Sequence, residues 1–205
     1  MRAQTPFDIR STALLFCDLQ NDFLHPKGAY ARGGQSSPDI AALPERIRPL
    51  EDALRAAGGM VIATHFTLVP GRGGEPLISP HLKQIRPFLT SGDFAPGSWG
   101  QATVDTLQPV DISVEKVAYS AFYMSRLEWV IRKLGITRLL VCGIVTNGGV
   151  TSTVRDAHVR DLDTVVIEDG CAAFTPSVHA TAIAGLRALC RVATVSEMLA
   201  EIAPA

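Results

Sequence analysis

Three short segments of the sequence carry residues that could do chemistry together. An acid, Asp18, stands in CDLQNDFL, an amine, Lys116, stands in VEKVAYSAF, and a glycine-rich turn reads GIVTNGGV. In one cleft, the carboxylate could shuttle a proton while the ammonium stabilises charge. Backbone N–H groups where the turn opens a helix could hold a developing oxyanion. These residue types together favour an acid–base site.

Each of these residues also has an ordinary structural interpretation. An Asp after a strand is most often a helix or turn cap. A Lys at a strand end is usually solvated, and a Gly pair can simply ease backbone packing. The coincidence of all three at strand ends favours a site, but spacing alone leaves both interpretations open.

Six short apolar runs indicate the strands that would position these residues. The runs are TALLFC (12–17), GMVIAT (59–64), ISVEK (112–116), RLLVCG (138–143), DTVVIE (163–168) and RVAT (191–194). Because they are apolar on both alternating faces, they are typical of a parallel sheet covered on both sides. Such sheets bind ligands beyond the carboxyl ends of their strands, where Asp18, Lys116 and the turn stand.

Helical patterns lie between the strands. Residues 39–57 carry aliphatic side chains at spacings of three and four and stop at a Gly pair. Ser125 and Glu128 form a capping-box pattern before a helix that Gly135 closes. A Thr-Pro pair opens another helix over 175–189. Strand and helix in repetition predict a doubly wound α/β sheet with right-handed crossovers.

Length and composition restrict the class of protein. The 205 residues are 47% hydrophobic and 19% charged, which predicts a single domain over residues 1–205 and argues against disorder, a coiled coil or a fibrous repeat. A formal charge of -1 favours neither a nucleic-acid nor a membrane partner. No apolar run reaches the roughly 20 residues of a spanning helix, and the first residues lack a secretory signal, so we expect a cytoplasmic protein. The Gly- and Pro-rich stretch 67–100 is expected to be a lid or binding segment.

The four cysteines are spread singly along the chain. They show no CxxC pattern, so neither a zinc knuckle nor a disulfide framework is indicated. Each lies in or beside an apolar run, which is typical of a buried free thiol. They are Cys17, Cys142, Cys171 and Cys190.

Four stretches of the chain carry a resemblance to a known family. They are ALLFCDLQNDFLHPKGA, FAPGSWG, VEKVAYSAFYMSRLEWVIRKLGITRLLVCGIVTNGGVTSTVRDAHVRDL and VVIEDGCAAF. In order and spacing they resemble the isochorismatase-like hydrolases over about residues 12–195. The resemblance implies a three-layer α/β sandwich whose six-stranded, mainly parallel sheet is flanked by helices. The family includes nicotinamidases, carbamoyl-amide hydrolases, maleamate-type amidases and isochorismatases.

In the amidases of this family an Asp, a Lys and a Cys form a catalytic triad. The resemblance places the acid at Asp18 and the amine at Lys116, and it places the nucleophile two residues after Asn147. That position is Gly149, which has no side chain to carry an acyl group, so a thioester route through it is closed. None of the four cysteines of this chain is placed to substitute.

Isochorismatases of the family also have glycine at this position and cleave a vinyl ether. The resemblance implies that the aspartic acid protonates the alkene carbon of the ether and that water captures the resulting cation. The match is incomplete, because isochorismatases commonly show an aromatic residue and a His where this chain has Val145 and Asn147. The resemblance also implies a cis peptide after Ile144, and an oxyanion hole from the amides of Gly149 and the region of Val145.

Asp18 has different requirements in the two routes. As a base it should be ionised, which Lys116 favours, whereas as a general acid it needs a raised pKa, which burial would have to supply. The sequence leaves open which effect on the pKa of Asp18 is larger, that of Lys116 or that of burial.

Further substrate-binding candidates surround these residues. Trp99 in PGSWG matches a family position near the substrate, and Gln20 either orients Asp18 or makes a turn contact. Tyr119 and Phe122 could line the pocket or belong to the core. Val145 and Asn147 are the remaining two substrate-binding candidates.

Charged and metal-binding candidates are fewer. His65 could touch substrate, but HFTLVPGRGG lacks the Asp-x-His cluster of the metal-binding nicotinamidases, so no metal and no other cofactor is expected. The cations that could bind a substrate carboxylate, or remain solvated, are Arg32, Arg72, Lys83 and Arg86.

The leading hypothesis is a hydrolase of a small polar or anionic molecule that works by non-covalent acid–base chemistry. The alternatives are a noncatalytic member that binds a small molecule or a protein, and an amidase whose nucleophilic cysteine has been replaced. The resemblance also implies a homodimer or homotetramer.

Overall fold

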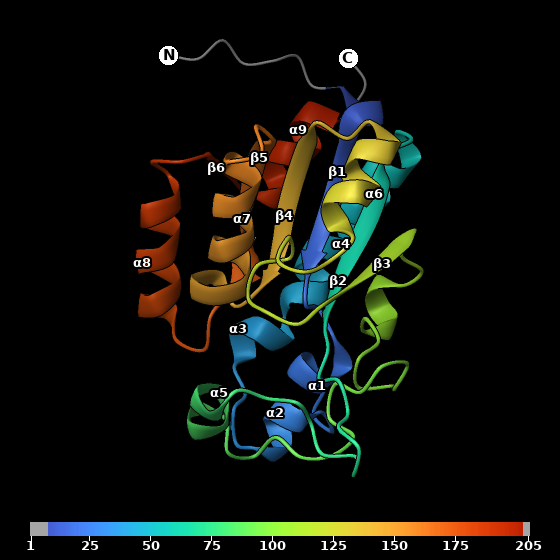
Figure 1. Cartoon of the computed structure of the whole chain (residues 1–205). Helices are drawn as coiled ribbons and strands as arrows, with labels where there is room; N and C mark the ends of the chain where they lie inside the picture. The colour runs from blue at the N-terminus through green and yellow to red at the C-terminus, as the bar shows by residue number, and fades with distance from the viewer. Residues whose placement is uncertain (1–7, 203–205) are drawn as a thin grey trace.

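A computed structural model of the chain describes residues 8–202 and has a six-stranded sheet at its centre. The strand order is β3-β2-β1-β4-β5-β6, and every neighbouring pair is parallel. The strands are β1 (Thr12–Cys17), β2 (Met60–Phe66), β3 (Ile112–Lys116), β4 (Arg138–Ile144), β5 (Asp163–Ala172) and β6 (Arg191–Ala193). The parallel α/β architecture expected from the sequence is thereby confirmed (Figure 1).

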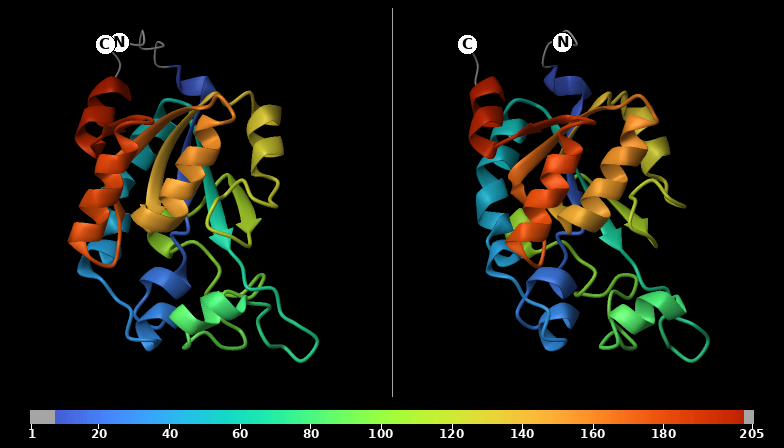
Figure 2. Two further views of the ribbon diagram at one scale, coloured as in Figure 1. Left: turned by 60° about the vertical axis from the view of Figure 1, so that its left-hand side comes forward. Right: turned by 90° about the vertical axis from the view of Figure 1, so that its left-hand side faces the viewer.

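Helices cover both faces of the sheet. The helices α3 (Pro38–Ala41), α4 (Leu43–Ala56) and α9 (Val195–Ile202) pack on one face, and α6 (Leu127–Leu134), α7 (Thr151–His158) and α8 (Pro176–Leu186) pack on the other. Figure 2 shows the three layers edge-on. The short helices α1 (Asn21–Leu24), α2 (Ala29–Arg32) and α5 (Pro80–Ile85) lie beyond the carboxyl ends of the strands (Figure 1).

The alternation of side chains along β1 explains why the sheet is covered twice. Leu14 and Phe16 join the core beneath α4 and α9, whereas Ala13, Leu15 and Cys17 join the core beneath α6 and α7. All five are fully buried. Burial of an aliphatic or aromatic side chain contributes about 1.5–3 kcal/mol, so both cores stabilise the sheet.

Three helix boundaries differ from the sequence prediction. The segment predicted as one helix over 39–57 forms α3 and α4, because Pro44 has no N–H to continue the first helix and instead begins the second. Ser125 accepts a hydrogen bond from Leu127 N at 3.1 Å, but Glu128 binds Arg132 and Arg160, so only half of the capping box forms. Helix α8 ends at residue 186, before the predicted end at 189.

Gly143 brings the two central strands close together. It pairs with Cys17 of β1 and has a φ of 123°, which favours glycine. A Cβ atom at this position would lie 2.1 Å from the carbonyl oxygen of Cys17. Any side chain here would push β4 away from β1, and with it the turn that follows β4.

The structure also gives the burial of the cysteines and the length and polarity of the helices. All four cysteines are free thiols, and three of them are buried as expected, whereas Cys190 is only partly buried because it lies in the turn after α8. Within residues 8–202, no helix is both long and apolar enough to cross a membrane.

Candidate active site

Asp18 and Lys116 meet at the carboxyl edge of the sheet. Asp18 directly follows β1 in a left-handed conformation, with a φ of 58°, which Asp tolerates better than most residues. Lys116 is the last residue of β3, and its Nζ lies 2.7 Å from Asp18 Oδ2. Asp18 is 4% exposed and Lys116 is 2% exposed. The two charges therefore form a buried ion pair, two strands apart in the sheet.

The ammonium group of Lys116 has a partner for each of its three protons. Besides the carboxylate, Nζ donates to the carbonyl oxygen of Ala118 at 2.8 Å and to that of Tyr119 at 3.1 Å. It also lies 5.8 Å from the centre of the Phe66 ring. Lys116 can therefore supply positive charge and hold Asp18 in place, but it has no proton left to donate to a ligand without losing one of these bonds.

Asp18 retains some capacity to accept or donate a proton. Thr64 donates to Oδ1 at 3.1 Å, and Lys116 occupies one side of Oδ2. Burial raises the pKa of Asp18 above its ordinary value of 3.8, although Lys116 and Thr64 act in the opposite direction. Protonation of Asp18 at a pH above its usual range is what a general acid requires.

The turn after β4 faces the free side of Asp18. The peptide bond between Ile144 and Val145 is cis, and Val145 O accepts hydrogen bonds from Gly148 N at 2.9 Å and from Val150 N at 3.3 Å. A Cβ atom at Gly149 would lie 3.3 Å from Asp18 Oδ2. It would also lie 2.8 Å from the carbonyl oxygen of Ile144, which is closer than real Cβ atoms come to other atoms. The turn in this form is fitted to glycine.

Two helices anchor this turn. Thr146 Oγ1 shares a hydrogen bond of 2.8 Å with His179 Nδ1 of α8, and Thr151 of α7 donates to the carbonyl oxygen of Thr146. Sequence reasoning missed Thr146, His179 and Thr64. Only the sheet register, which pairs Thr64 with Cys17, could have pointed to Thr64.

A cavity of about 400 Å³ opens over Asp18, Lys116 and Gly149. We call it the Asp18 cavity. Its wall includes Phe23, Tyr30, Phe66, His81, Arg86, Tyr119, Val145, Asn147 and Phe174. Three of the substrate-binding candidates, Tyr119, Val145 and Asn147, thus lie on its wall.

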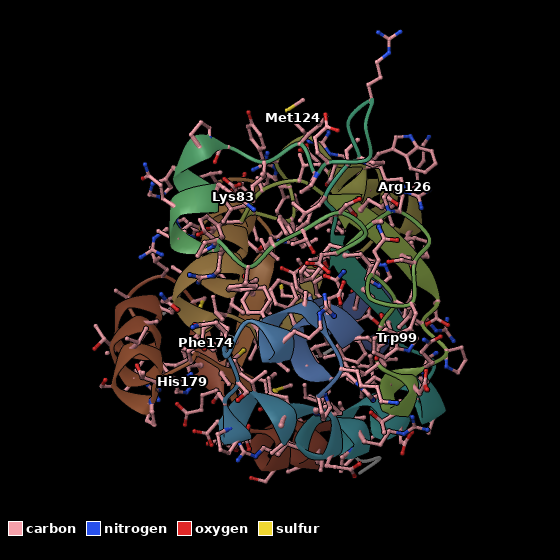
Figure 3. The ribbon with its side chains drawn as sticks, turned by 90° about the horizontal axis from the view of Figure 1, so that it is seen from below. Lys83, Trp99, Met124, Arg126, Phe174 and His179 are labelled. Atoms are coloured by element: carbon pink, nitrogen blue, oxygen red, sulfur yellow. The ribbon has the colours of Figure 1, made fainter. Side chains whose placement is uncertain are left out.

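The other three candidates lie elsewhere. Gln20 is fully buried and binds both backbone polar groups of Phe66, so it ties the end of β2 to the segment after β1. Trp99 is 49% exposed and packs edge-on against His25, and Figure 3 shows it across this face from Phe174. Phe122 belongs to the core beneath α6 and α7. None of the three lines the Asp18 cavity. For Trp99 this differs from the expectation, because distant contacts such as the bond from Asn21 to its carbonyl oxygen fix its position. The core position of Phe122 was one of its two alternatives, and the side chain of Gln20 makes long-range backbone contacts where a contact to Asp18 or within a turn was expected.

Of the four candidate cations, Arg86 lines the Asp18 cavity. Arg32 forms an ion pair with Asp93, and Lys83 donates to the carbonyl oxygen of Leu89 at 2.6 Å. Arg72 is exposed in the loop before α5. Figure 3 shows Lys83 on α5 at the rim of this face.

His65 faces a second hollow, which we call the outer groove. This groove, of about 800 Å³, is larger than the Asp18 cavity and lies along the edge strand β3. Its lining residues are His65, Gly97, Ser98, Gln101, Ala102, Ser113, Glu115, Met124, Ser125 and Arg126. Within residues 8–202, no group of three or more His, Cys, Asp or Glu side chains could hold a metal ion.

Comparisons with known proteins agree with this fold and place the chain in a family. The family model described as the Isochorismatase domain matches residues 12–198, so the chain belongs to the isochorismatase family. A ureidoacrylate amidohydrolase RutB from Caulobacter vibrioides is 34% identical over 177 residues, which are 80% of this chain and 78% of the relative. The family consists of hydrolases, and the chain is a member of that enzyme class.

Solved structures show the same fold. A cysteine hydrolase from Pseudomonas syringae superposes with a TM-score of 0.82 at 24% identity, covering 98% of each chain. An N-carbamoylsarcosine amidase from Thermoplasma acidophilum superposes with a TM-score of 0.70 at 23% identity, covering 90% of this chain and 96% of that one.

Proposed function

We propose that this protein hydrolyses a small polar or anionic molecule without forming a covalent enzyme intermediate. Gly149 stands where amidases of the family have their nucleophilic cysteine, and Asp18 carries the proton. The observation that supports this most directly is the 3.3 Å between Asp18 Oδ2 and the position of a Cβ atom at Gly149. The carboxyl group thus borders the space that a nucleophilic side chain would fill, which leaves room there for water.

The first route that fits is the hydrolysis of a vinyl ether. Protonated Asp18 gives its proton to the alkene carbon, which forms a C–H bond and leaves an oxocarbenium ion. The resulting carboxylate is stabilised by Lys116, 2.7 Å away. Water adds to the cation, and its spare proton returns to Asp18 as the hemiketal collapses to a carbonyl compound and an alcohol. Burial supports this route because it raises the pKa of Asp18.

The second candidate is the hydrolysis of a carbamoyl amide. It is favoured by the relatives that are 34% identical and are named ureidoacrylate amidohydrolases. Here Asp18 would be ionised and would take a proton from water beside Gly149 as that water adds to the carbonyl carbon, while the amides of the turn would bind the oxyanion. The C–N bond would then break as Asp18 returns the proton to the departing nitrogen. Water would replace the thiol as nucleophile.

The test is turnover of isochorismate and of ureidoacrylate by the wild type and by Asp18→Asn. The variant should lose about a thousandfold in kcat on whichever compound is cleaved, because amide and carboxyl differ in proton transfer but little in shape. A rate that falls as the pH rises through the pKa of Asp18 indicates the acid route, and a rate that increases indicates the base route. Undiminished turnover by Asp18→Asn would remove the proposed proton carrier.

Two further outcomes separate the alternatives. Tight binding of either compound without any product would favour a noncatalytic binding protein. Amidase activity gained by Gly149→Cys would favour an amidase that lacks only its thiol. We expect no such gain, because the Cβ atom would lie 2.8 Å from Ile144 O and would displace the turn.

A further inference from the structure

The loop between β3 and α6, residues 117–126, supplies two of the three acceptors that hold the ammonium group of Lys116. They are the carbonyl oxygens of Ala118 and Tyr119, which lie 2.8 Å and 3.1 Å from Nζ. The third acceptor is Asp18 Oδ2, at 2.7 Å. The direction of the ammonium group therefore depends on where this loop, which we call the lysine loop, holds its carbonyl groups.

Two side chains of α7 hold the lysine loop in place. Ser120 Oγ donates to Asp156 Oδ2 and accepts a hydrogen bond from Phe122 N at 3.1 Å. Ala121 N donates to Thr153 Oγ1 at 3.0 Å. Ser120 is 7% exposed and Thr153 is fully buried, so water has little access to replace these bonds. Thr153 and Asp156 are three positions apart on α7, and so they lie on the same side of the helix.

Arg160, just beyond the end of α7, keeps Asp156 in position. Its Nη1 donates to the carbonyl oxygen of Asp156 at 2.9 Å and lies 3.7 Å from Oδ1, which leaves Oδ2 for Ser120. Its Nε lies 2.8 Å from Glu128 Oε2 of α6. Its central carbon lies 4.8 Å from the ring centre of Phe122 in the lysine loop. The arginine thus connects α6, α7 and the loop.

Helix α7 is also joined to the turn on the other side of Asp18. The helix begins at Thr151, whose hydroxyl donates to the carbonyl oxygen of Thr146 in the turn that contains Gly149. A Cβ atom at Gly149 would lie 3.3 Å from Asp18 Oδ2. One helix therefore holds both the lysine loop and the glycine turn around the same carboxyl group.

We propose that Asp156 is a positioning residue, which acts through Ser120 to hold the loop carbonyl groups that direct the ammonium of Lys116 toward Asp18. Asp156 itself binds Ser120 and Arg160 and does not line the Asp18 cavity. The inference rests on the proposed function for the role of Asp18 as proton carrier, but the positioning does not need turnover. Without Asp156 the lysine loop loosens, and Lys116 stabilises the carboxylate of Asp18 less. Because Lys116 lowers the pKa of Asp18, this pKa should then rise.

The experiment measures two quantities by NMR in the whole protein. One is the pKa of Asp18, from a titration of its carboxyl carbon signal, which Asp18→Asn identifies. The other is the hydrogen exchange of the Ala121 amide, which reports how firmly the lysine loop is held. Asp156→Ala should raise the pKa of Asp18 and make this amide exchange about tenfold faster. Asp156→Asn keeps an oxygen that accepts from Ser120, so it should restore most of both values.

The direction of the change separates positioning from a direct effect of charge. Loss of the negative charge of Asp156 would by itself lower the pKa of Asp18, because a nearby carboxylate raises the pKa of a carboxyl group. The control is Asp163→Ala, which removes the ion pair of 2.7 Å with Arg138 at the amino end of the sheet. It should leave the pKa of Asp18 and the exchange of Ala121 unchanged. Ser120→Ala removes the same bond from the side of the loop and should act like Asp156→Ala.

Three results would overturn the proposal. These are a pKa of Asp18 that does not rise in folded Asp156→Ala, an equal rise in Asp156→Asn, and an equal rise in Asp163→Ala. If Asp156→Ala does not fold, the pKa of Asp18 in Ser120→Ala decides the question in the same way. Absence of turnover in the wild type, with the pKa of Asp18 raised as expected in Asp156→Ala, would remove the proposed function and leave this inference standing.

Discussion

The Asp18 cavity and the outer groove both hold polar side chains at the carboxyl edge of the sheet, yet they use them differently. In the outer groove the polar groups bind one another. His65 shares a hydrogen bond of 2.8 Å with Thr103, and Gln101 donates to Thr67 and Glu115. Arg126 donates to the carbonyl oxygen of Ser113 at 2.7 Å. These bonds connect the edge strand to the loops beside it.

In the Asp18 cavity, two polar groups keep hydrogen-bonding or ion-pairing positions that other residues do not fill. Asp18 Oδ2 has a free side toward Gly149, and Arg86 stands at the other end without a carboxylate partner among the described residues. The outer groove is the larger of the two hollows, so size and polar content do not identify the reactive one. A candidate site is better identified by donors, acceptors and charges that have no partner within the fold.

The largest effect on stability is expected for Lys116→Met, compared with Glu115→Gln in the outer groove. Removing one partner of a buried ion pair should lower the free energy of unfolding by about 3–5 kcal/mol at neutral pH. Glu115 is exposed, so its substitution should change this energy by less than about 0.5 kcal/mol. Urea unfolding of the three proteins provides the measurement.

The free energy of unfolding of Lys116→Met should depend on pH in a predictable way. Without Lys116, burial holds the pKa of Asp18 even further above its value in the unfolded chain. The folded variant then keeps a proton that the unfolded chain releases above about pH 4, so the variant loses stability as the pH rises. The gap to the wild type should be smallest in acid and widen toward neutral pH. A gap that does not depend on pH would mean that Asp18 is not the group left uncompensated.

An intermediate effect is expected for Gly149→Ala, with Gly185→Ala of α8 as its control. The added Cβ atom would lie 2.8 Å from Ile144 O, and displacing the turn should cost about 1–3 kcal/mol. At Gly185 a Cβ atom would meet no described atom within 4 Å, so Ala should stabilise the helix by up to about 0.5 kcal/mol. Thermal unfolding measures both. Equal effects would show that the turn does not require glycine.

The smallest effect is expected for His65→Gln. Loss of the bond to Thr103 should cost about 1 kcal/mol at neutral pH. Burial lowers the pKa of His65 below its ordinary value of 6.5, so the unfolded chain takes up a proton before the folded one does. The wild type should therefore lose stability relative to His65→Gln as the pH falls below 6.5. Parallel stability curves between about pH 5 and about pH 7 would contradict this placement of His65.

Local pattern was sufficient to predict the sheet. All six apolar runs became strands. The central strand β1 is buried at every position and is apolar throughout except at Thr12, as expected for a strand covered on both faces. Helix ends were predicted less well, since Pro44 and the partners of Glu128 decide them. The extension of β5 to Ala172 depends on its irregular pairing with β4, which no local pattern reveals.

The candidate site was partly predictable for the same reason. Asp18 and Lys116 follow strands, and parallel strands bring their carboxyl ends to one edge, so their meeting follows from topology. Trp99 and Phe122 lie in segments whose course depends on distant contacts, such as the bond of Asn21 to the carbonyl oxygen of Trp99. The position of Arg86 also depends on a distant contact, because it binds Tyr30, 56 residues earlier in the chain.

The floor and the mouth of the Asp18 cavity come from different parts of the chain. The floor belongs to the ends of β1, β3 and β4, which the sheet and Gly143 hold at a fixed spacing, whereas α5 and Arg86 belong to the long segment outside the sheet. Mutations in α5 can therefore alter which molecules enter while the reactive groups keep their places. Under the proposed function, substitutions in this one peripheral helix should change the choice of substrate while the proton-transfer groups remain in place.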